Sequence, residues 1–247
     1  MSKPLGGNMN ADILAPSPGD VAVDPEAPQM SAAQTLIGVF TEPKKTFGSL
    51  REKPRILAPV LVLLLFQLIF GLVLAQSGVM KNDAVAKMEA KNAPQEQMDA
   101  VNRMMDGPIK YVFAVTGPIA VVFILLISGG ILFFMGNLML GARLRYTHYL
   151  CVAAYGAVVG IVDQMVRMAL AVSRGTLQVH LGVGAFLGDQ LSPVMKILDT
   201  ATDPLLLWAI AIQAVGVGVM AKKGFGFGLL AVLPGTLIMI CLSAFQG

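Results

Sequence analysis

The chain has 247 residues, of which 55% are hydrophobic and 13% charged, and its formal net charge is +3. Soluble domains carry roughly 25% charged residues, so this composition excludes an ordinary water-facing surface. The basic residues flank apolar blocks and form no stripe with aromatic residues between them, which argues against nucleic-acid binding.

The first 55 residues precede any apolar run long enough to span a membrane. Residues 1–30 contain five prolines and four acidic residues against one lysine, which predicts a disordered cytoplasmic tail. Residues 31–55 are predicted to form short amphipathic or interfacial helices. Ser31 and Gln34 have the spacing of a capping box, which predicts a helix ending near Thr41. Pro43 can open a second helix.

The second short helix has an apolar face and several basic positions. Phe47 and Leu50 share one face of the helix. We interpret the segment as interfacial, lying on an anionic leaflet; the alternative is a solvated linker next to the membrane. The candidate lipid-surface contacts are Lys44, Lys45, Arg51, Lys53 and Arg55.

Residues 56–247 are predicted to form an all-α membrane domain, a bundle of about five transmembrane helices. Their apolar runs are near 20 residues long, which is the length that a helix needs to cross a hydrocarbon core of roughly 30 Å. We expect spans at about 56–75, 112–138, 150–172, 204–221 and 225–245. The first span is also expected to serve as an uncleaved signal.

The segments between the spans have their own patterns. Residues 76–108 are polar, with apolar residues at roughly helical spacing, and predict amphipathic helices broken at Pro94. The apolar run 109–140 would be about 48 Å long as a helix, so it must tilt, protrude or kink. Pro118 and the glycine pair 129–130 are the candidate kinks. Residues 177–187 are too short to span and are predicted to be re-entrant or interfacial.

The distribution of basic residues predicts the orientation. Nine lysines and arginines fall on one side of the expected spans, namely five in residues 44–55, together with Arg143, Arg145, Lys222 and Lys223. Cytoplasmic segments of membrane proteins are enriched in lysine and arginine. The amino terminus is therefore expected in the cytoplasm and the carboxyl terminus across the membrane.

The third expected span carries a candidate polar set made of Asp163, Gln164 and Arg167. Asp163 and Arg167 are one helical turn apart, so their side chains can pair within the membrane. One hypothesis is that the pair serves a small-solute or proton transporter or channel. The alternative is a structural ion pair. Small-residue spacings that begin at Gly156, Ala214 and Gly224 are compatible with helix packing inside the chain or between copies.

Nothing in the sequence has the spacing of a catalytic, cofactor or metal site. Ser128-Gly129 invites comparison with a membrane serine protease, but position 126 is leucine and neither His148 nor His180 lies clearly opposite it. The histidines have no cysteine or carboxylate at ligand spacing, and both cysteines lie in or beside apolar blocks. We therefore expect no catalytic residue, cofactor or metal, and no enzyme.

Two groups of motifs resemble the Yip family of membrane proteins, which is named for interaction with Ypt/Rab GTPases. The segment leading into the first span resembles the start of the family's membrane domain through Phe40, Pro43, Phe47, Pro54 and Pro59. A later segment resembles the last third of the family's bacterial members through Asp203, Trp208 and Gly216, followed by the 222–223 lysine pair. The resemblance covers about residues 36–247.

The resemblance implies five spans, a cytoplasmic amino terminus and a non-enzymatic role as a membrane adaptor or organiser. The chain differs from the family where Gly160-Ile161 replaces a proline expected soon after Tyr155. The short proline-rich amino terminus and alanine-rich spans resemble bacterial members, so the expected location is a bacterial inner membrane. Expected partners are the lipid bilayer, membrane or cytosolic proteins and further copies of the chain, with no nucleic acid; the Rab partnership is not carried over.

Overall fold

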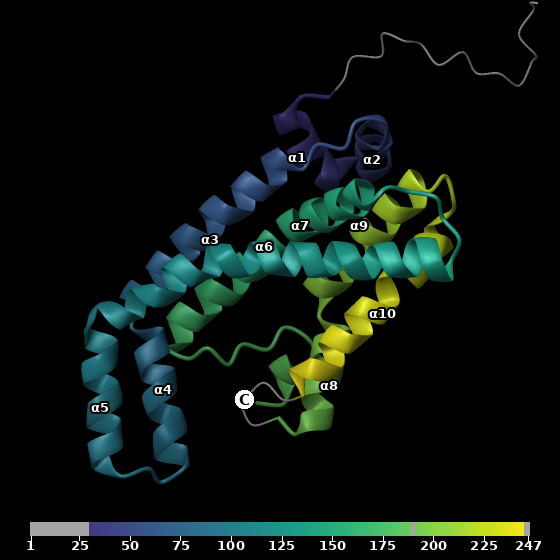
Figure 1. Cartoon of the computed structure of the whole chain (residues 1–247). Helices are drawn as coiled ribbons and strands as arrows, with labels where there is room; N and C mark the ends of the chain where they lie inside the picture. Colours follow the sequence, from purple (N-terminus) through teal and green to yellow (C-terminus); the bar gives the residue numbers. More distant parts are fainter. Residues whose placement is uncertain (1–29, 189–190, 245–247) are drawn as a thin grey trace, which may run out of the picture.

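The computed structural model describes residues 30–188 and 191–244, and within these ranges the chain is helical without a β-strand. The tail predicted for residues 1–30 lies, apart from Met30, outside the described residues. Figure 1 shows a bundle of long helices, with two short helices at one end and a helical hairpin at the other.

The two short helices at the amino-terminal end are α1 (Ala32–Thr41) and α2 (Pro43–Glu52). The expected capping box starts α1: Ser31 Oγ accepts a hydrogen bond from the Gln34 backbone N–H, and the Gln34 side chain accepts one from the Ser31 N–H. Pro43 occupies the first turn of α2, where its missing N–H costs nothing. The pair lies across one end of the bundle (Figure 1).

Four helical segments of the described residues are long and apolar enough to cross a membrane: α3 (Leu57–Ser77), the continuous segment 108–139, α7 (Tyr146–Arg174) and α10 (Phe225–Ser243). Helices α8 (Pro193–Thr202) and α9 (Pro204–Met220) are bent by 55° and count as a fifth span if taken together. The 17 residues of α9 alone extend about 26 Å, which is short of a full hydrocarbon core. The described residues thus form an all-α membrane protein with four or five candidate spans.

The segment 108–139 changes its helical type along its length. It begins as η1 (Pro108–Tyr111, a 3-10 turn), continues as α6 (Val112–Phe133), and ends as η2 (Phe134–Met139, a π-helix). Pro118 lies inside α6, and the departure from α-helical geometry comes after the glycine pair. Helix α7 runs unbroken through Gly160, where the family pattern led us to expect a proline.

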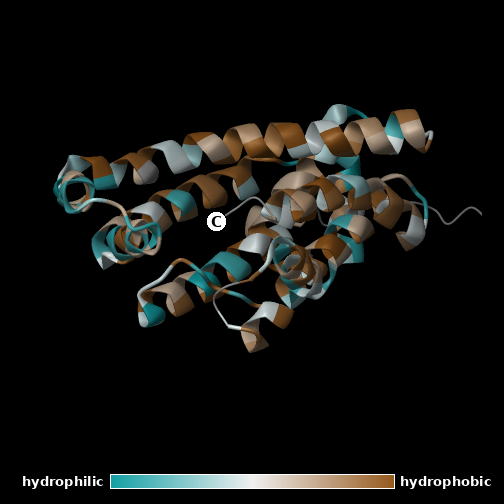
Figure 2. Ribbon diagram, turned by 90° about the horizontal axis from the view of Figure 1, so that it is seen from below, coloured by the Kyte–Doolittle hydropathy of each residue, from teal (hydrophilic) through white to brown (hydrophobic). Residues whose placement is uncertain are grey.

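The core lies where α7 and α9 meet the helices around them. Tyr149, Val152 and Tyr155 of α7 are buried, as are Val217 and Met220 of α9. The outward faces of α3, α6 and α10 are apolar and exposed, as a lipid-facing surface should be. Figure 2 shows hydrophobic residues along the long helices and hydrophilic residues mainly toward the ends of the bundle.

Small residues let α9 and α10 approach closely. A Cβ atom added to Gly228 would overlap the backbone of Ala214, and one added to Gly218 would lie 2.8 Å from the Gly224 carbonyl oxygen. Gly156 of α7 packs against the side chain of Gln213 in the same way. Each of these three glycines is thus used for a close packing contact inside the chain.

The polar segments protrude at the end opposite α1 and α2. Helices α4 (Val79–Ala90) and α5 (Gln95–Asp106) form a hairpin, with Pro94 immediately before α5 (Figure 1). The apolar stretch 177–187 begins with residues of irregular structure and contains the short 3-10 helix η3 (Val183–Phe186).

Candidate functional site

The first candidate site is the junction at which α1 and α2 dock on the bundle. Phe47 of α2 is 0% exposed, and its ring meets that of Tyr155 edge-on with centroids 6.3 Å apart. Gly216 of α9 faces the same ring, because a Cβ atom there would lie 2.9 Å from Phe47 Cζ. Phe47 and Gly216 belong to the two separate motifs that suggested the family, and the fold brings them into contact.

Helix α1 is fixed to the same junction by two further contacts. The Phe40 ring packs against Trp208 with centroids 5.7 Å apart. The Tyr155 hydroxyl donates a hydrogen bond of 2.9 Å to Thr35 Oγ1, and Thr35 is buried. Four family-motif residues, Phe40, Phe47, Trp208 and Gly216, therefore meet at one junction between α1–α2 and α7–α9.

The remaining prolines of the first motif occupy neighbouring positions. Pro43 opens α2, Pro54 lies in the turn between α2 and α3, and Pro59 is buried in the first turn of α3. Proline is tolerated at such positions because the first N–H groups of a helix have no partner within the helix.

The outward side of α2 is basic. Lys44, Lys45 and Lys53 are exposed, with 71% of the Lys45 side chain accessible, whereas Arg51 and Arg55 are half-buried. The Arg55 guanidinium donates a 3.0 Å hydrogen bond to the Met30 carbonyl. Since Thr46, Phe47 and Leu50 are buried in the protein, the apolar face of α2 is not available for insertion into a leaflet.

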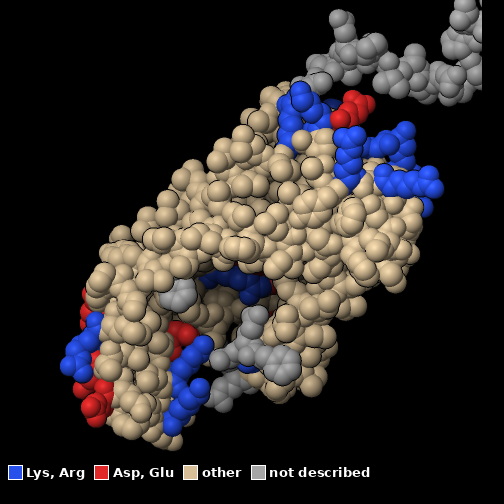
Figure 3. Space-filling view, in the orientation of Figure 1, with Lys and Arg blue, Asp and Glu red and all other residues tan. Residues whose placement is uncertain are grey.

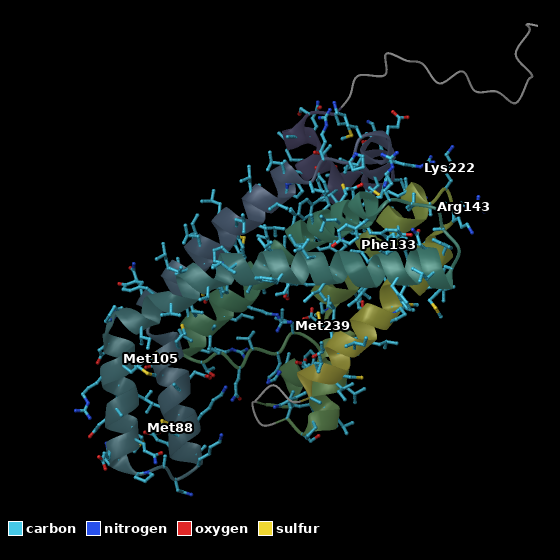
Figure 4. The ribbon with its side chains drawn as sticks, in the orientation of Figure 1. Met88, Met105, Phe133, Arg143, Lys222 and Met239 are labelled. Atoms are coloured by element: carbon cyan, nitrogen blue, oxygen red, sulfur yellow. The ribbon has the colours of Figure 1, made fainter. Side chains whose placement is uncertain are left out.

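Other segments add basic residues at this end of the molecule. Figure 4 labels Arg143 and Lys222 there, and Figure 3 shows lysine and arginine atoms gathered over the same end. We define the basic end as the exposed residues Lys44, Lys45, Lys53, Arg143, Arg145, Lys222 and Lys223. Three segments separated in sequence thus contribute to one charged surface.

The second candidate site surrounds Arg167. Its Nε donates hydrogen bonds of 2.9 and 3.1 Å to the two carboxylate oxygens of Asp163, which is the pairing expected from their spacing. One terminal nitrogen donates to Asp203 Oδ2, and the other donates to the Val179 carbonyl at 3.0 Å. Gln164 is half-buried and makes no hydrogen bond within the described residues.

Asp203 is the residue at which α8 ends and α9 begins. It is buried, and its Oδ1 accepts hydrogen bonds from the backbone N–H groups of Leu205 and Leu206, at 2.9 and 3.3 Å. Its other oxygen binds Arg167 of α7. Arg167 therefore ties α7 to the bend between α8 and α9, and the sequence motif gave no sign of this contact.

A third polar cluster holds the segment before α8. The buried Asp199 accepts a hydrogen bond of 2.8 Å from His180 Nδ1 and two more from the backbone N–H groups of Gly182 and Gly184, at 2.9 and 3.0 Å. The sequence interpretation placed no carboxylate beside His180, because Asp199 lies 19 residues away. The other histidine, His148, contacts the carbonyl oxygen of Arg51.

A fourth cluster closes the turn between η2 and α7. Asn137 Oδ1 accepts hydrogen bonds from the Leu144 N–H at 3.2 Å and from the Tyr149 hydroxyl at 2.8 Å, while Asn137 Nδ2 donates to the Leu144 carbonyl. Phe133, labelled in Figure 4, meets the Tyr149 ring edge-on. Asn137 was missed by the sequence reasoning, although an asparagine near a turn glycine is a known turn signal.

These clusters position helices and loops. The four nitrogen contacts of Arg167 are all made to acceptors of the protein itself. His148 and His180 contact Arg51 and Asp199, and neither is recorded in contact with Ser128, the serine compared with a protease nucleophile. In the described part of the chain, no group of three histidine, cysteine or acidic residues could hold a metal ion. What the geometry offers is a rigid junction with a charged surface on one side.

Comparison with known proteins identifies the family. The family model described as the Yip1 domain matches residues 37–245, which include the second half of α1, all of α2 and every candidate span. No curated protein and no solved structure matches the chain significantly. The matched segment covers most of the 247 residues. The chain therefore belongs to the Yip1 domain family.

Proposed function

We propose that the chain is a non-enzymatic membrane adaptor or organiser, located in a bacterial inner membrane with its amino terminus in the cytoplasm. In this proposal the basic end faces the cytoplasm, where it lies against the anionic surface of the leaflet and binds a membrane or cytosolic protein. Membership of the Yip1 domain family and the arrangement of the helices support the proposal.

The observation that carries the proposal is the positive charge of the basic end, part of which lies on a helix, α2, that is docked on α7 and α9. The basic end holds seven exposed lysines and arginines, and the exposed acidic residues of α2 and its cap are Glu42 and Glu52. Glu42 is paired with Lys45 at 3.0 Å. An anionic leaflet contributes about 1 kcal/mol of attraction for each basic residue near its surface, and this attraction falls off within roughly 10 Å at 0.1 M salt.

The docking of α1 and α2 explains how this surface could select a partner. Phe40, Phe47 and Tyr155 hold the two helices on α7 and α9. A surface that is already ordered loses little conformational entropy when it binds, so more of the contact energy is available for affinity. An acidic protein surface next to the membrane is the partner that the charges favour.

Site-specific photo-crosslinking of the full-length protein in its native membrane tests the proposal. One variant carries a photoreactive amino acid in place of Lys45 at the basic end, and the control carries it in place of Lys91, an exposed lysine in the turn of the opposite hairpin. We expect a reproducible protein adduct from position 45 and none of that mass from position 91. Adducts to lipid alone at position 45, or the same adducts at both positions, would contradict an adaptor role.

The competing hypothesis is a transporter or channel that uses Asp163 and Arg167. The contacts of Arg167 favour a structural role instead, because a transport cycle would have to break hydrogen bonds to Asp163, Asp203 and Val179. The double variant Asp163→Asn with Arg167→Met distinguishes the two hypotheses. A solute or proton flux that the double variant abolishes, while the folded yield is kept, would support transport and overturn the structural role.

A further inference from the structure

A charged pocket lies at the end of the bundle opposite the basic end. It is formed where α3 ends, α4 begins, α5 ends and η1 begins. Its volume is about 180 Å³, and the side chains that give it its character are Gln76, Met80, Lys81, Met105, Asp106 and Lys110. Met105 lies between α5 and α4 in Figure 4.

The sequence around the pocket places it at the depth of the lipid headgroups. The apolar run of α3 stops at Ala75, and the apolar run of α6 starts at Val112, so two spans leave the membrane beside the pocket. Tyr111 is 38% exposed at this level, and tyrosine is enriched at the interface between the hydrocarbon and the headgroups. Lysine side chains at such positions extend toward the headgroups.

The charges of the pocket do not cancel. Lys81 Nζ lies 2.8 and 2.9 Å from the two carboxylate oxygens of Asp106, which makes a neutral pair. The Lys110 ammonium lies 5.3 Å from the centroid of the Tyr111 ring, and it has no carboxylate within 4.0 Å in the described part of the chain. The pocket therefore carries one excess positive charge beside a polar amide, that of Gln76.

We propose that this pocket binds the phosphodiester of an anionic phospholipid headgroup. Lys110 supplies the neutralising charge, Lys81 and Gln76 supply further hydrogen-bond donors, and the net charge of +1 matches a single phosphodiester. The acyl chains would then lie along exposed apolar residues of the adjoining helix ends, among them Val73 of α3 and Val112 of α6.

The fold prepares the pocket through a tight turn between α3 and α4. Gly78 has φ +73°, a left-handed conformation that favours glycine, and it lets α4 turn away directly after α3. As a result the first turn of α4 brings Lys81 to the last residue of α5, Asp106. This site lies at the other end of the bundle from the adaptor surface and does not depend on it.

Native mass spectrometry of the full-length protein ejected from nanodiscs tests the proposal. The nanodiscs contain equal amounts of phosphatidylglycerol and phosphatidylcholine, and the bound lipids are counted for the wild type, Lys110→Gln and Lys91→Gln. The Lys91 variant loses the same charge at the same end of the bundle, in the turn between α4 and α5 and away from the pocket. From the worth of one basic residue near an anionic surface, we expect about fivefold less phosphatidylglycerol on Lys110→Gln and no change on Lys91→Gln.

Further measurements separate the alternatives. Lys110→Arg should retain the anionic lipid, because the charge and donors are kept. Equal losses in Lys110→Gln and Lys91→Gln, or equal retention of the two lipids by the wild type, would overturn the site. Inorganic phosphate added at millimolar concentration should not displace the lipid, and complete displacement would show that the pocket recognises a free phosphate ion instead of a headgroup. Circular dichroism of each variant confirms that the fold is kept.

Discussion

Phe47→Ala is the change that most directly weakens the docking of α1 and α2. The Phe47 side chain is 0% exposed and fills the space between Tyr155, Val152 and Gly216. Truncation of a buried phenylalanine to alanine costs roughly 3–5 kcal/mol, which combines lost burial with the cavity left behind. Because Phe47 contacts α7 and α9 from α2, this cost falls on the docking of the helix pair.

Hydrogen–deuterium exchange of the protein in nanodiscs measures this docking. Amides that exchange through local opening report the free energy of that opening. A loss of about 3 kcal/mol corresponds to exchange that is faster by about two orders of magnitude. We expect this increase in residues 32–52 and no change in α6.

Phe123→Ala is the matched control, because Phe123 of α6 is 61% exposed on the outer surface of the bundle. It removes the same atoms without opening a cavity between α2 and α9. Unchanged exchange in residues 32–52 of the Phe47 variant would refute the docking, and so would an equal increase in both variants.

Two other predictions concern the packing of α7, α9 and α10. Arg167→Met should lower the free energy of unfolding of the purified protein by roughly 3 kcal/mol, because it leaves the buried Asp203 carboxylate without its positively charged partner. The double variant with Asp203→Asn should lose less, since asparagine still caps α9; an equal or larger loss would contradict the role given to the pair. Gly228→Val should prevent α9 and α10 from packing and abolish the monodisperse peak in size-exclusion chromatography, whereas Gly226→Val should be tolerated, because a Cβ at Gly226 meets nothing within 4 Å. Equal behaviour of the two glycine variants would refute this packing.

The features that the sequence predicted well depend on neighbouring residues. The all-α class and the number of spans follow from the length of the apolar runs. The cap at Ser31 and the pairing of Asp163 with Arg167 follow from spacings of three and four residues. The excess of basic residues in 44–55 could likewise be predicted from the sequence, because these residues are close together in the chain.

The features that the sequence could not predict join distant residues. Arg167 and Asp203 are 36 residues apart, and the contact between them forms only when the α8–α9 bend packs on α7. A moderately polar stretch before Pro204 gave no indication that α8 continues toward α9 with a bend of 55°. Likewise, Phe47 and Gly216 could be recognised as parts of two motifs, but their contact required the tertiary structure.

The proposed function requires that the basic end faces the cytoplasm, on the side of the membrane opposite the α4–α5 hairpin. A cysteine placed at Lys45 or at Lys91, in a chain with Cys241→Ser and with only the buried Cys151 left, tests this orientation by labelling with a membrane-impermeant maleimide. If the basic end is cytoplasmic, position 45 is labelled in inverted membrane vesicles and not in intact cells, and position 91 shows the reverse. Labelling of both positions from one side, or labelling of position 45 in intact cells, would contradict it.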